Sequence, residues 1–174
     1  MDEVDPAIRI VEPDPAWPEE ARTELYRIAA ALGPVALRLE HVGSTAVPGL
    51  SAKPIVDLQL SVASLEPFAA YGDPLARLGY RFAPDPEMPD YHFFGKPPER
   101  PRTHHLHVCE AGSEHERRHL AVRDFLRADP DEAARYAELK RSVAARHPRD
   151  RLGYIAGKDR YVAELEARAL RWIR

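Results

Sequence analysis

The chain of 174 residues contains a single cysteine, Cys109, so no disulfide can form within it. A protein without such cross-links suits a reducing compartment, and we expect it to be cytoplasmic. No stretch approaches the roughly 20 consecutive apolar residues of a membrane-spanning helix. Residues 1–15 carry acidic residues and prolines where a signal peptide has a basic and then an apolar segment. The sequence therefore predicts neither a membrane anchor nor secretion.

An excess of positive charge is also missing. The chain has 25 Lys and Arg against 28 Asp and Glu, and its formal net charge is -3. Nucleic-acid-binding domains usually carry a basic excess, so we expect a small molecule or a nucleotide as substrate and not a nucleic acid. The chain shows no internal repeat, and its length fits one domain spanning 1–174.

The hydrophobic pattern places helices on both sides of a β-rich middle. Period-two alternation predicts strands, and apolar residues at helical spacing predict helices. We expect strands at 35–44, 54–62 and 103–110, a hairpin of short aromatic strands near 80–84 and 91–95, and helices at about 18–32, 64–78 (interrupted near 72–74), 114–128, 130–146 and from 153 or 158 to 173. This order predicts an α/β (α+β) fold, in which flanking helices cover a mixed sheet and the C-terminal part has three helices. On the last helix we assign Tyr161, Leu165 and Trp172 to the core.

One charged side chain lies inside the most strand-like segment. In PIVDLQLSV, the alternation puts Val56 and Leu58 on an apolar face and Asp57 and Gln59 on the other. A carboxylate on a strand face is costly to desolvate unless a metal ion, a cation or backbone donors accompany it. Asp57 therefore needs a partner, and both a structural salt bridge and a functional role satisfy that need.

Two histidines offer such a partner. His105 and His107 in THHLHVCE project from one face of the third strand, and they reach Asp57 if that strand pairs beside 54–62. Two imidazoles and a carboxylate suit a divalent metal. Histidines at this spacing are also found packed and hydrogen-bonded in cores, so both interpretations stay open.

Several residues around this strand predict phosphate binding. Gly43 and Ser44 end a strand at a turn, where backbone N–H groups can approach a phosphate, although an ordinary turn has the same composition. Lys53 lies just before the Asp57 strand, and Lys158 follows the glycine-flanked segment GYIAGK at the expected entry of the last helix. Further basic residues that could complete the pocket are Arg100, Arg102 and Arg123.

Four segments together resemble a known family. EHVGSTAVPGLSAKPIVDLQL, followed in order by THHLHVCE, FLRADPDEAARYAELK and GYIAGKDRYVAELEARAL, resembles the GrpB family from about residue 8 to the C-terminus. That family is similar to the DNA polymerase beta type of nucleotidyltransferases and to the C-terminal extension of some dephospho-CoA kinases. The resemblance implies a nucleotidyltransferase-type mixed sheet, a phosphate-binding turn at Gly43 and Ser44, and Asp57 as the catalytic, metal-binding carboxylate.

The sequence departs from the nucleotidyltransferase pattern at the next metal position. There, a second carboxylate two residues after the first helps to hold the magnesium that clamps the nucleotide phosphates. Here that residue is Gln59, whose neutral amide offers an oxygen without a charge. The expected metal ligands are therefore Asp57, Gln59, His105 and His107. Because Gln59 carries no negative charge, this set would bind two magnesium ions more weakly than two carboxylates do.

Two functions are compatible with these residues. In the first, the protein is a metal-dependent nucleotidyltransferase that transfers a nucleotidyl group from a nucleoside triphosphate to a small acceptor, using Mg²⁺ or another divalent cation. In the second, it is a noncatalytic module that binds a nucleotide or another anion and has a degenerate metal site. The first requires a divalent metal, whereas ligand binding in the second survives chelation.

Overall fold

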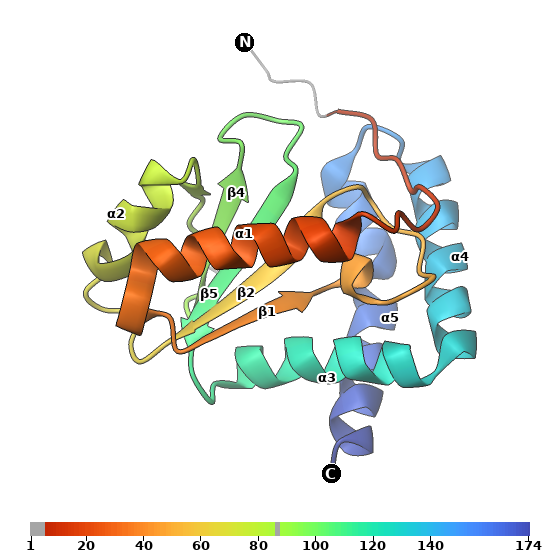
Figure 1. Cartoon of the computed structure of the whole chain (residues 1–174). Helices are drawn as coiled ribbons and strands as arrows, with labels where there is room; N and C mark the ends of the chain where they lie inside the picture. The colour runs from red at the N-terminus through yellow and green to blue at the C-terminus, as the bar shows by residue number, and fades with distance from the viewer. Residues whose placement is uncertain (1–5, 86–87) are drawn as a thin grey trace.

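The computed structural model describes residues 6–85 and 88–174 (Figure 1). Residues 1–5 of the acidic N-terminal segment, and residues 86–87 between the two aromatic strands, lie outside the described part. The elements are α1 (Trp17–Leu32), η1 (Gly33–Val35), β1 (Arg38–Val42), η2 (Ser44–Ala46), β2 (Val56–Val62), α2 (Ala69–Arg77), β3 (Arg81–Phe82), β4 (Tyr91–Lys96), β5 (His104–Glu110), α3 (Glu114–Ala128), α4 (Pro130–Arg146) and α5 (Arg151–Trp172). The expected α/β class with three C-terminal helices is confirmed.

The strands form one mixed sheet in the order β1-β2-β5-β4-β3. β2 and β5 are parallel neighbours, and the other pairs are antiparallel. In the register of the central pair, Asp57 lies opposite His105 and Gln59 lies opposite His107. The condition for contact between Asp57 and the two histidines is therefore met, because the two strands are neighbours and place the carboxylate and both imidazoles on one face of the sheet.

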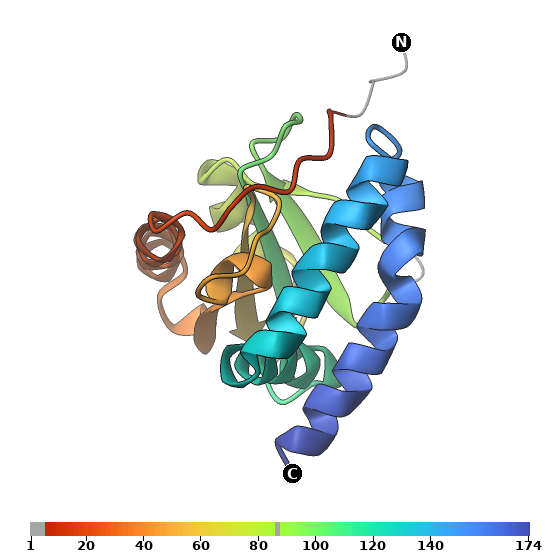
Figure 2. The same cartoon turned by 90° about the vertical axis from the view of Figure 1, so that its right-hand side faces the viewer.

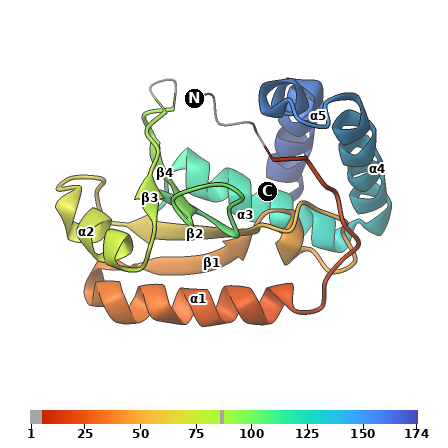
Figure 3. The same ribbon diagram turned by 90° about the horizontal axis from the view of Figure 1, so that it is seen from above.

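Helices cover the two faces of the sheet unequally. Seen from above, α1 runs along one face, while α3 crosses the other face and α4 and α5 stand beside one end of the sheet (Figure 3). The α1 face holds the main core, in which Leu58, Leu60 and Leu106 of the sheet and Ile28 of α1 are fully buried. Burying such a side chain contributes about 1.5–3 kcal/mol. The predicted apolar face of β2 is confirmed.

In a second, smaller hydrophobic core, the segment between β1 and β2 packs against the C-terminal helices. Val47 and Leu50 of that segment pack with Leu126 of α3, Ala137 of α4 and Leu165 of α5. Figure 2 shows α4 and α5 side by side, with the segment after β1 between them and the sheet. This packing fixes where α4 and α5 present their side chains to the end of β2.

The predicted break in α2 is wrong. The helix continues through Pro74 to Arg77. An internal proline removes one backbone hydrogen bond, but Tyr71 and Leu75 are completely buried. Tertiary packing therefore outweighs the local cost, as it does for most short helices.

For the last helix, the earlier of the two predicted starts is confirmed and one core assignment is wrong. α5 begins at Arg151, close to the predicted start at 153, because the Asp150 side chain caps it by accepting a hydrogen bond from the Gly153 N–H, and GYIAGK lies in its first turns. A Cβ at Gly157 would lie 2.6 Å from Cγ1 of Val143, so this glycine allows close packing of α5 on α4. Trp172 is 51% exposed and is not a core residue, although its ring centroid lies 5.8 Å from that of Phe125. Leu165 is buried as expected.

No helix in the described part of the chain combines the length and the hydrophobicity needed to cross a membrane.

Candidate functional site

Asp57 lies at the start of β2, where the sheet meets the C-terminal helices. Its Oδ1 is 3.2 Å from Nδ1 of His105 and 3.8 Å from Nε2 of His107. Burial opposes ionisation of the carboxyl group, but the interactions with His105 and His107 outweigh it and hold the pKa of Asp57 well below its ordinary range. Burial lowers the pKa of His105 despite this contact, so at neutral pH we assign His105 as a neutral imidazole that donates through Nδ1–H.

Gly43 brings the chain directly over this carboxylate. Its φ of 71° is unfavourable for other residues, and a Cβ there would lie 2.7 Å from Oδ2 of Asp57. The turn leads into η2, which begins at Ser44. The first N–H groups of such a turn have no acceptor within it and are suited to bind an anion.

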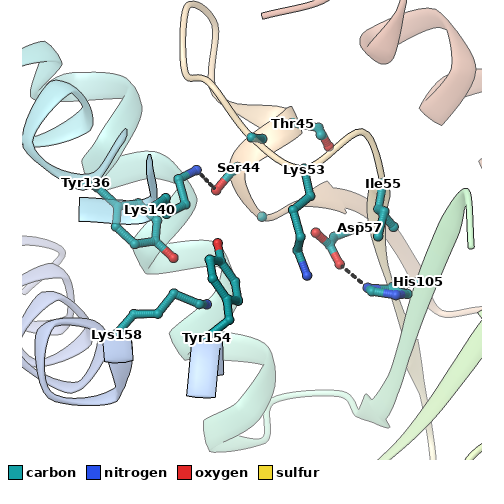
Figure 4. Close-up of a pocket in the computed structure, with 12 residues that line it drawn as sticks. Ser44, Thr45, Lys53, Ile55, Asp57, His105, Tyr136, Lys140, Tyr154 and Lys158 are labelled. Atoms are coloured by element: carbon teal, nitrogen blue, oxygen red, sulfur yellow. Dashed lines mark hydrogen bonds and ion pairs between the residues drawn. The ribbon is translucent and has the colours of Figure 1, made fainter. Parts of the chain in front are cut away.

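A cavity of about 220 Å³ opens beside this turn and contains three lysines (Figure 4). It is lined by Gly43, Ser44, Thr45, Ala52, Lys53, Ile55, Asp57, His105, Tyr136, Lys140, Tyr154 and Lys158. Lys53 and Lys158 lie on either side of the Tyr154 ring, with their Nζ atoms 5.4 and 5.1 Å from its centroid. We call this cavity the lysine pocket. Of its lining residues, one is a carboxylate and three are lysines.

Lys140 is the most deeply buried of the three lysines. Its Nζ donates to Oγ of Ser44 at 2.8 Å and to the carbonyl of Ser51 at 2.6 Å. Burial lowers the pKa of Lys140 to about 7, and the neighbouring ammonium of Lys158 acts in the same direction. Burial also lowers the pKa values of Lys53 and Lys158. An anion in the lysine pocket would supply the negative charge that favours the ammonium form of each lysine.

A larger cavity, of about 760 Å³, adjoins the lysine pocket and shares Lys53, Ile55, Asp57, His105, Tyr154 and Lys158 with it. Beyond the shared residues, its lining includes Phe93 and His107 of the sheet, Ile155 of α5, and the basic residues Arg100, Arg102 and Arg151. One cavity is thus dominated by lysines, and its neighbour offers both apolar and basic groups.

The structure brings most of the predicted site residues together. Gly43, Ser44, Lys53, Asp57, His105 and Lys158 all line the lysine pocket, and His107 lines the larger cavity. Gln59 lines neither cavity. It is completely buried, and neither its amide oxygen nor its amide nitrogen has a hydrogen-bond partner. Arg123 bonds to Glu40 and to the carbonyl of His41 and lines neither cavity.

Three residues of the lysine pocket carry no sequence signal that points to them. Tyr136 and Lys140 lie on α4 and Tyr154 on α5, and they reach the site only because these helices dock against the segment after β1. Nothing in the local sequence of α4 indicates that its lysine bonds to Ser44 and lines the same pocket as Asp57. The sequence predicts Lys158 from the glycine beside it, Gly157, but in the structure that glycine allows α5 to pack closely on α4.

A motif on α3 adds two histidines next to His107. Residues 115–119 read HERRH, and the spacing H-E-x-x-H is typical of zinc-binding helices in metalloproteases. In those enzymes the glutamate is a general base, but here Glu116 accepts hydrogen bonds from Oγ of Ser61 at 2.5 Å and from N–H of Gly112 at 2.7 Å. With its carboxylate engaged in these contacts, Glu116 is not available as such a base.

A family model and several known proteins match nearly the whole chain. A family model described as "GrpB protein" matches residues 7–168. A UPF0157 protein of Pseudomonas aeruginosa is 43% identical over 169 residues, which cover 95% of this chain and 69% of that protein. The UPF0157 protein YqkA of Bacillus subtilis is 35% identical, covering 95% of this chain and 48% of its own length.

Two further matches concern a longer enzyme and a solved structure. A protein of Mycolicibacterium paratuberculosis named dephospho-CoA kinase is 34% identical over a region that covers 95% of this chain and 46% of that protein. The chain therefore spans about half the length of this relative and of the Bacillus protein. The crystal structure of the conserved protein GrpB from Enterococcus faecalis superimposes with a TM-score of 0.87 at 32% identity, covering 95% of this chain and 99% of that one.

Proposed function

The chain belongs to the GrpB family, and we propose that its lysine pocket binds a nucleotide through the phosphate groups. The observation that carries the proposal is the charge of the pocket, where Lys53, Lys140 and Lys158 surround a single carboxylate, Asp57. A cluster of ammonium groups beside free backbone N–H groups is the arrangement that proteins use for phosphate oxygens.

The shape of the site supports a nucleotide over a bare anion. The lysine pocket alone, at about 220 Å³, is smaller than the roughly 300–1,000 Å³ of typical ligand sites, but the adjoining cavity adds about 760 Å³. Phosphates next to the lysines would leave the nucleoside in the larger cavity, beside Phe93 and Ile155. An aromatic ring and an aliphatic side chain are suitable neighbours for a base.

The second candidate is nucleotidyl transfer, the reaction of the DNA polymerase beta type of nucleotidyltransferases, to which we propose that the chain is related. It is favoured by Asp57, which is ionised and lies in the same pocket as the lysines. Asp57, His105 and His107 can offer a divalent cation one carboxylate and two imidazoles, whereas Gln59 is buried away from both cavities. Such a cation would offset phosphate charge during transfer. This donor set fits one cation better than the two-carboxylate site of that superfamily.

Relatives named dephospho-CoA kinase support a nucleotide-related ligand class. Because this chain spans less than half of that relative, the match does not identify a reaction, and the kinase activity is not transferred to this chain.

The test is isothermal titration of the protein with ATP, with adenosine and with inorganic triphosphate, each with Mg²⁺ and with a chelator. We expect ATP and triphosphate to bind and adenosine to bind far more weakly. Lys158→Met should lower ATP affinity by roughly 10- to 100-fold, because one charge-assisted contact of about 1.5–3 kcal/mol is lost. Arg160→Met removes an exposed charge from the same helix and should leave the affinity unchanged.

The chelator arm separates the two candidates. Binding that persists without divalent cations supports the noncatalytic module, and binding that requires Mg²⁺ and is lost in Asp57→Ala supports nucleotidyl transfer. Equal affinity for adenosine and ATP, or equal ATP affinity in wild type and Lys158→Met, contradicts phosphate recognition by the lysine pocket.

A further inference from the structure

Three histidines from two elements converge between the sheet and α3. His107 projects from β5, and His115 and His119 are four residues apart on α3, so both lie on the helix face turned to the same point. One ring nitrogen of each lies within 4.8 Å of those of the other two. Among the described residues, this is the one group of three or more potential metal-ligating side chains that is so closely gathered.

Four ring nitrogens of these three histidines are buried without a hydrogen-bond partner. His115 is only 2% exposed, and neither of its ring nitrogens has a partner. The Nδ1 atoms of His107 and His119 are also buried without a partner. Buried polar groups in folded proteins are nearly always hydrogen-bonded, so several unpartnered nitrogens at one point indicate that a ligand normally satisfies them. The convergence of the three histidines and the lack of partners for their nitrogens are two independent observations that indicate a ligand between β5 and α3.

We propose that His107, His115 and His119 bind a transition-metal ion, and that Zn²⁺ is the ion this donor set suits best. Neutral imidazoles are good ligands for Zn²⁺, Co²⁺ and Ni²⁺, whereas Mg²⁺ and Ca²⁺ prefer oxygen donors. Three histidines provide three of four tetrahedral positions and leave the fourth for water or a ligand. The proposal does not depend on nucleotide binding, because none of these nitrogens lies in the lysine pocket.

The second nitrogen of His107 connects the proposed metal to the carboxylate. Its Nε2 faces Oδ1 of Asp57 at 3.8 Å, which leaves the unpartnered Nδ1 for the metal. A carboxylate on the far nitrogen of a metal-bound histidine fixes the orientation of the ring and increases its basicity. Asp57 is therefore a positioning residue for the metal site as well as a member of the lysine pocket. Because Glu116 is held by Ser61 and Gly112, the site is not expected to act as a protease.

The experiment measures the metal directly. The full chain, first stripped with a chelator, is titrated with Co²⁺ while the visible absorption of the bound ion is recorded, and then with Zn²⁺ in competition with a fluorescent chelator. We expect one equivalent of metal per chain and Co²⁺ absorption typical of a four-coordinate site. His119→Phe and His115→Phe should each lower Zn²⁺ affinity by more than the roughly 10- to 100-fold that loss of an outer-shell partner causes.

Phenylalanine is chosen because it preserves the ring, including the stacking of His115 on Tyr91 at a centroid distance of 4.1 Å, and removes only unpartnered nitrogens at residue 115. The matched control is His104→Phe, on the opposite face of the same strand, which should bind Zn²⁺ like wild type. Asp57→Asn should lower Zn²⁺ affinity by roughly 10- to 100-fold, as expected for an outer-shell group.

A second readout separates metal binding from packing. Zn²⁺ should raise the unfolding temperature of wild type and of His104→Phe, since a ligand bound only to the folded state stabilises it, and should not raise that of His119→Phe. If all three histidines only pack, the phenylalanine variants will bind Zn²⁺ like wild type. Either that result, or less than stoichiometric metal uptake by wild type, overturns the proposal.

Discussion

Two carboxylates of this molecule, one completely buried and one partly exposed, have opposite surroundings. Glu132 on α4 is completely buried, accepts two hydrogen bonds from Arg168 at 2.6 and 2.7 Å, and also contacts Arg135 and the hydroxyl of Tyr161. Asp57 has one hydrogen bond at 3.2 Å, from His105, and faces a cavity.

The two carboxylates differ in how completely side chains of the folded protein pair with them. At Glu132, hydrogen bonds from Arg168, supported by Tyr161 and Arg135, lower the pKa to about 2 against the effect of burial, and Glu132 lines neither the lysine pocket nor the larger cavity. Around Asp57, positive groups outnumber the carboxylate and have room beside them. The Glu132 centre is therefore interpreted as structural, and the lysine pocket as a site that a ligand completes.

The largest expected effect comes from breaking the structural centre. Glu132→Gln should lower the free energy of unfolding by about 3 kcal/mol, at the low end of the range for a broken buried ion pair, because Arg168 and Arg135 can still reach solvent. Denaturation in urea measures the change. ATP affinity of the folded protein should stay the same.

The matched control is Glu138→Gln on the same helix, whose carboxylate is exposed and pairs only loosely with Arg141. It should change stability by less than about 0.5 kcal/mol. If Glu132→Gln were as mild as this control, the interpretation of the Glu132 centre as a structural element would be wrong.

A second prediction uses the pH dependence of the lysine pocket. Burial lowers the pKa of Lys140 from 10.5 to about 7 in the folded chain. Between these values the unfolded chain binds more protons than the folded one, so this lysine makes stability rise with pH from about 7 to 10.5. The affinity for an anion should instead fall as the pH rises above 7. An anion binds the ammonium form of Lys140, so binding takes up a proton when the lysine is neutral.

Sulfate is a suitable probe, since its charge does not change over this range. Its affinity should fall by up to about tenfold per pH unit above pH 7 in wild type. Lys140→Met should bind sulfate more weakly and with a shallower dependence on pH, as isothermal titration at several pH values would show. An identical slope in both proteins would contradict the role assigned to Lys140.

The central part of this site was predictable from sequence because it lies on two regular strands. Alternation alone assigned Asp57 to one face of β2 and His105 and His107 to one face of β5, and parallel pairing then brought them together. Gly43 was also recognisable, because it ends a predicted strand at a turn, although only the structure shows that a Cβ there would lie 2.7 Å from Oδ2 of Asp57.

The rest depended on tertiary contacts that no local pattern encodes. Lys140 reaches the pocket through the docking of Val47 and Leu50 on α4 and α5. Gly157 illustrates a related limit, because the sequence does not show that this glycine allows α5 to pack closely on Val143 of α4. Trp172 was assigned to a core from its helical spacing, but spacing does not reveal that the last turn extends past its neighbours.

The smallest expected effect concerns Gln59, the residue in place of a second carboxylate. It is completely buried on β2, and neither its amide oxygen nor its amide nitrogen has a hydrogen-bond partner. Both carboxylate oxygens of Glu132, in contrast, accept hydrogen bonds. Gln59→Met keeps the approximate volume and removes the unpaired amide, and should raise the free energy of unfolding by about 1 kcal/mol. Ser61→Ala, two residues along the same face, should instead be destabilising, because Ser61 donates a hydrogen bond to Glu116.

The same variant tests the metal role predicted for Gln59 from the sequence. If Gln59 is no ligand, as its position away from both cavities indicates, Gln59→Met will bind ATP with Mg²⁺ as wild type does. A loss of Mg²⁺-dependent binding in a protein that is more stable than wild type would restore Gln59 to the metal site. That result would also mean that β2 rearranges when the ligand binds, because the amide has to leave its buried position to reach a cation beside Asp57.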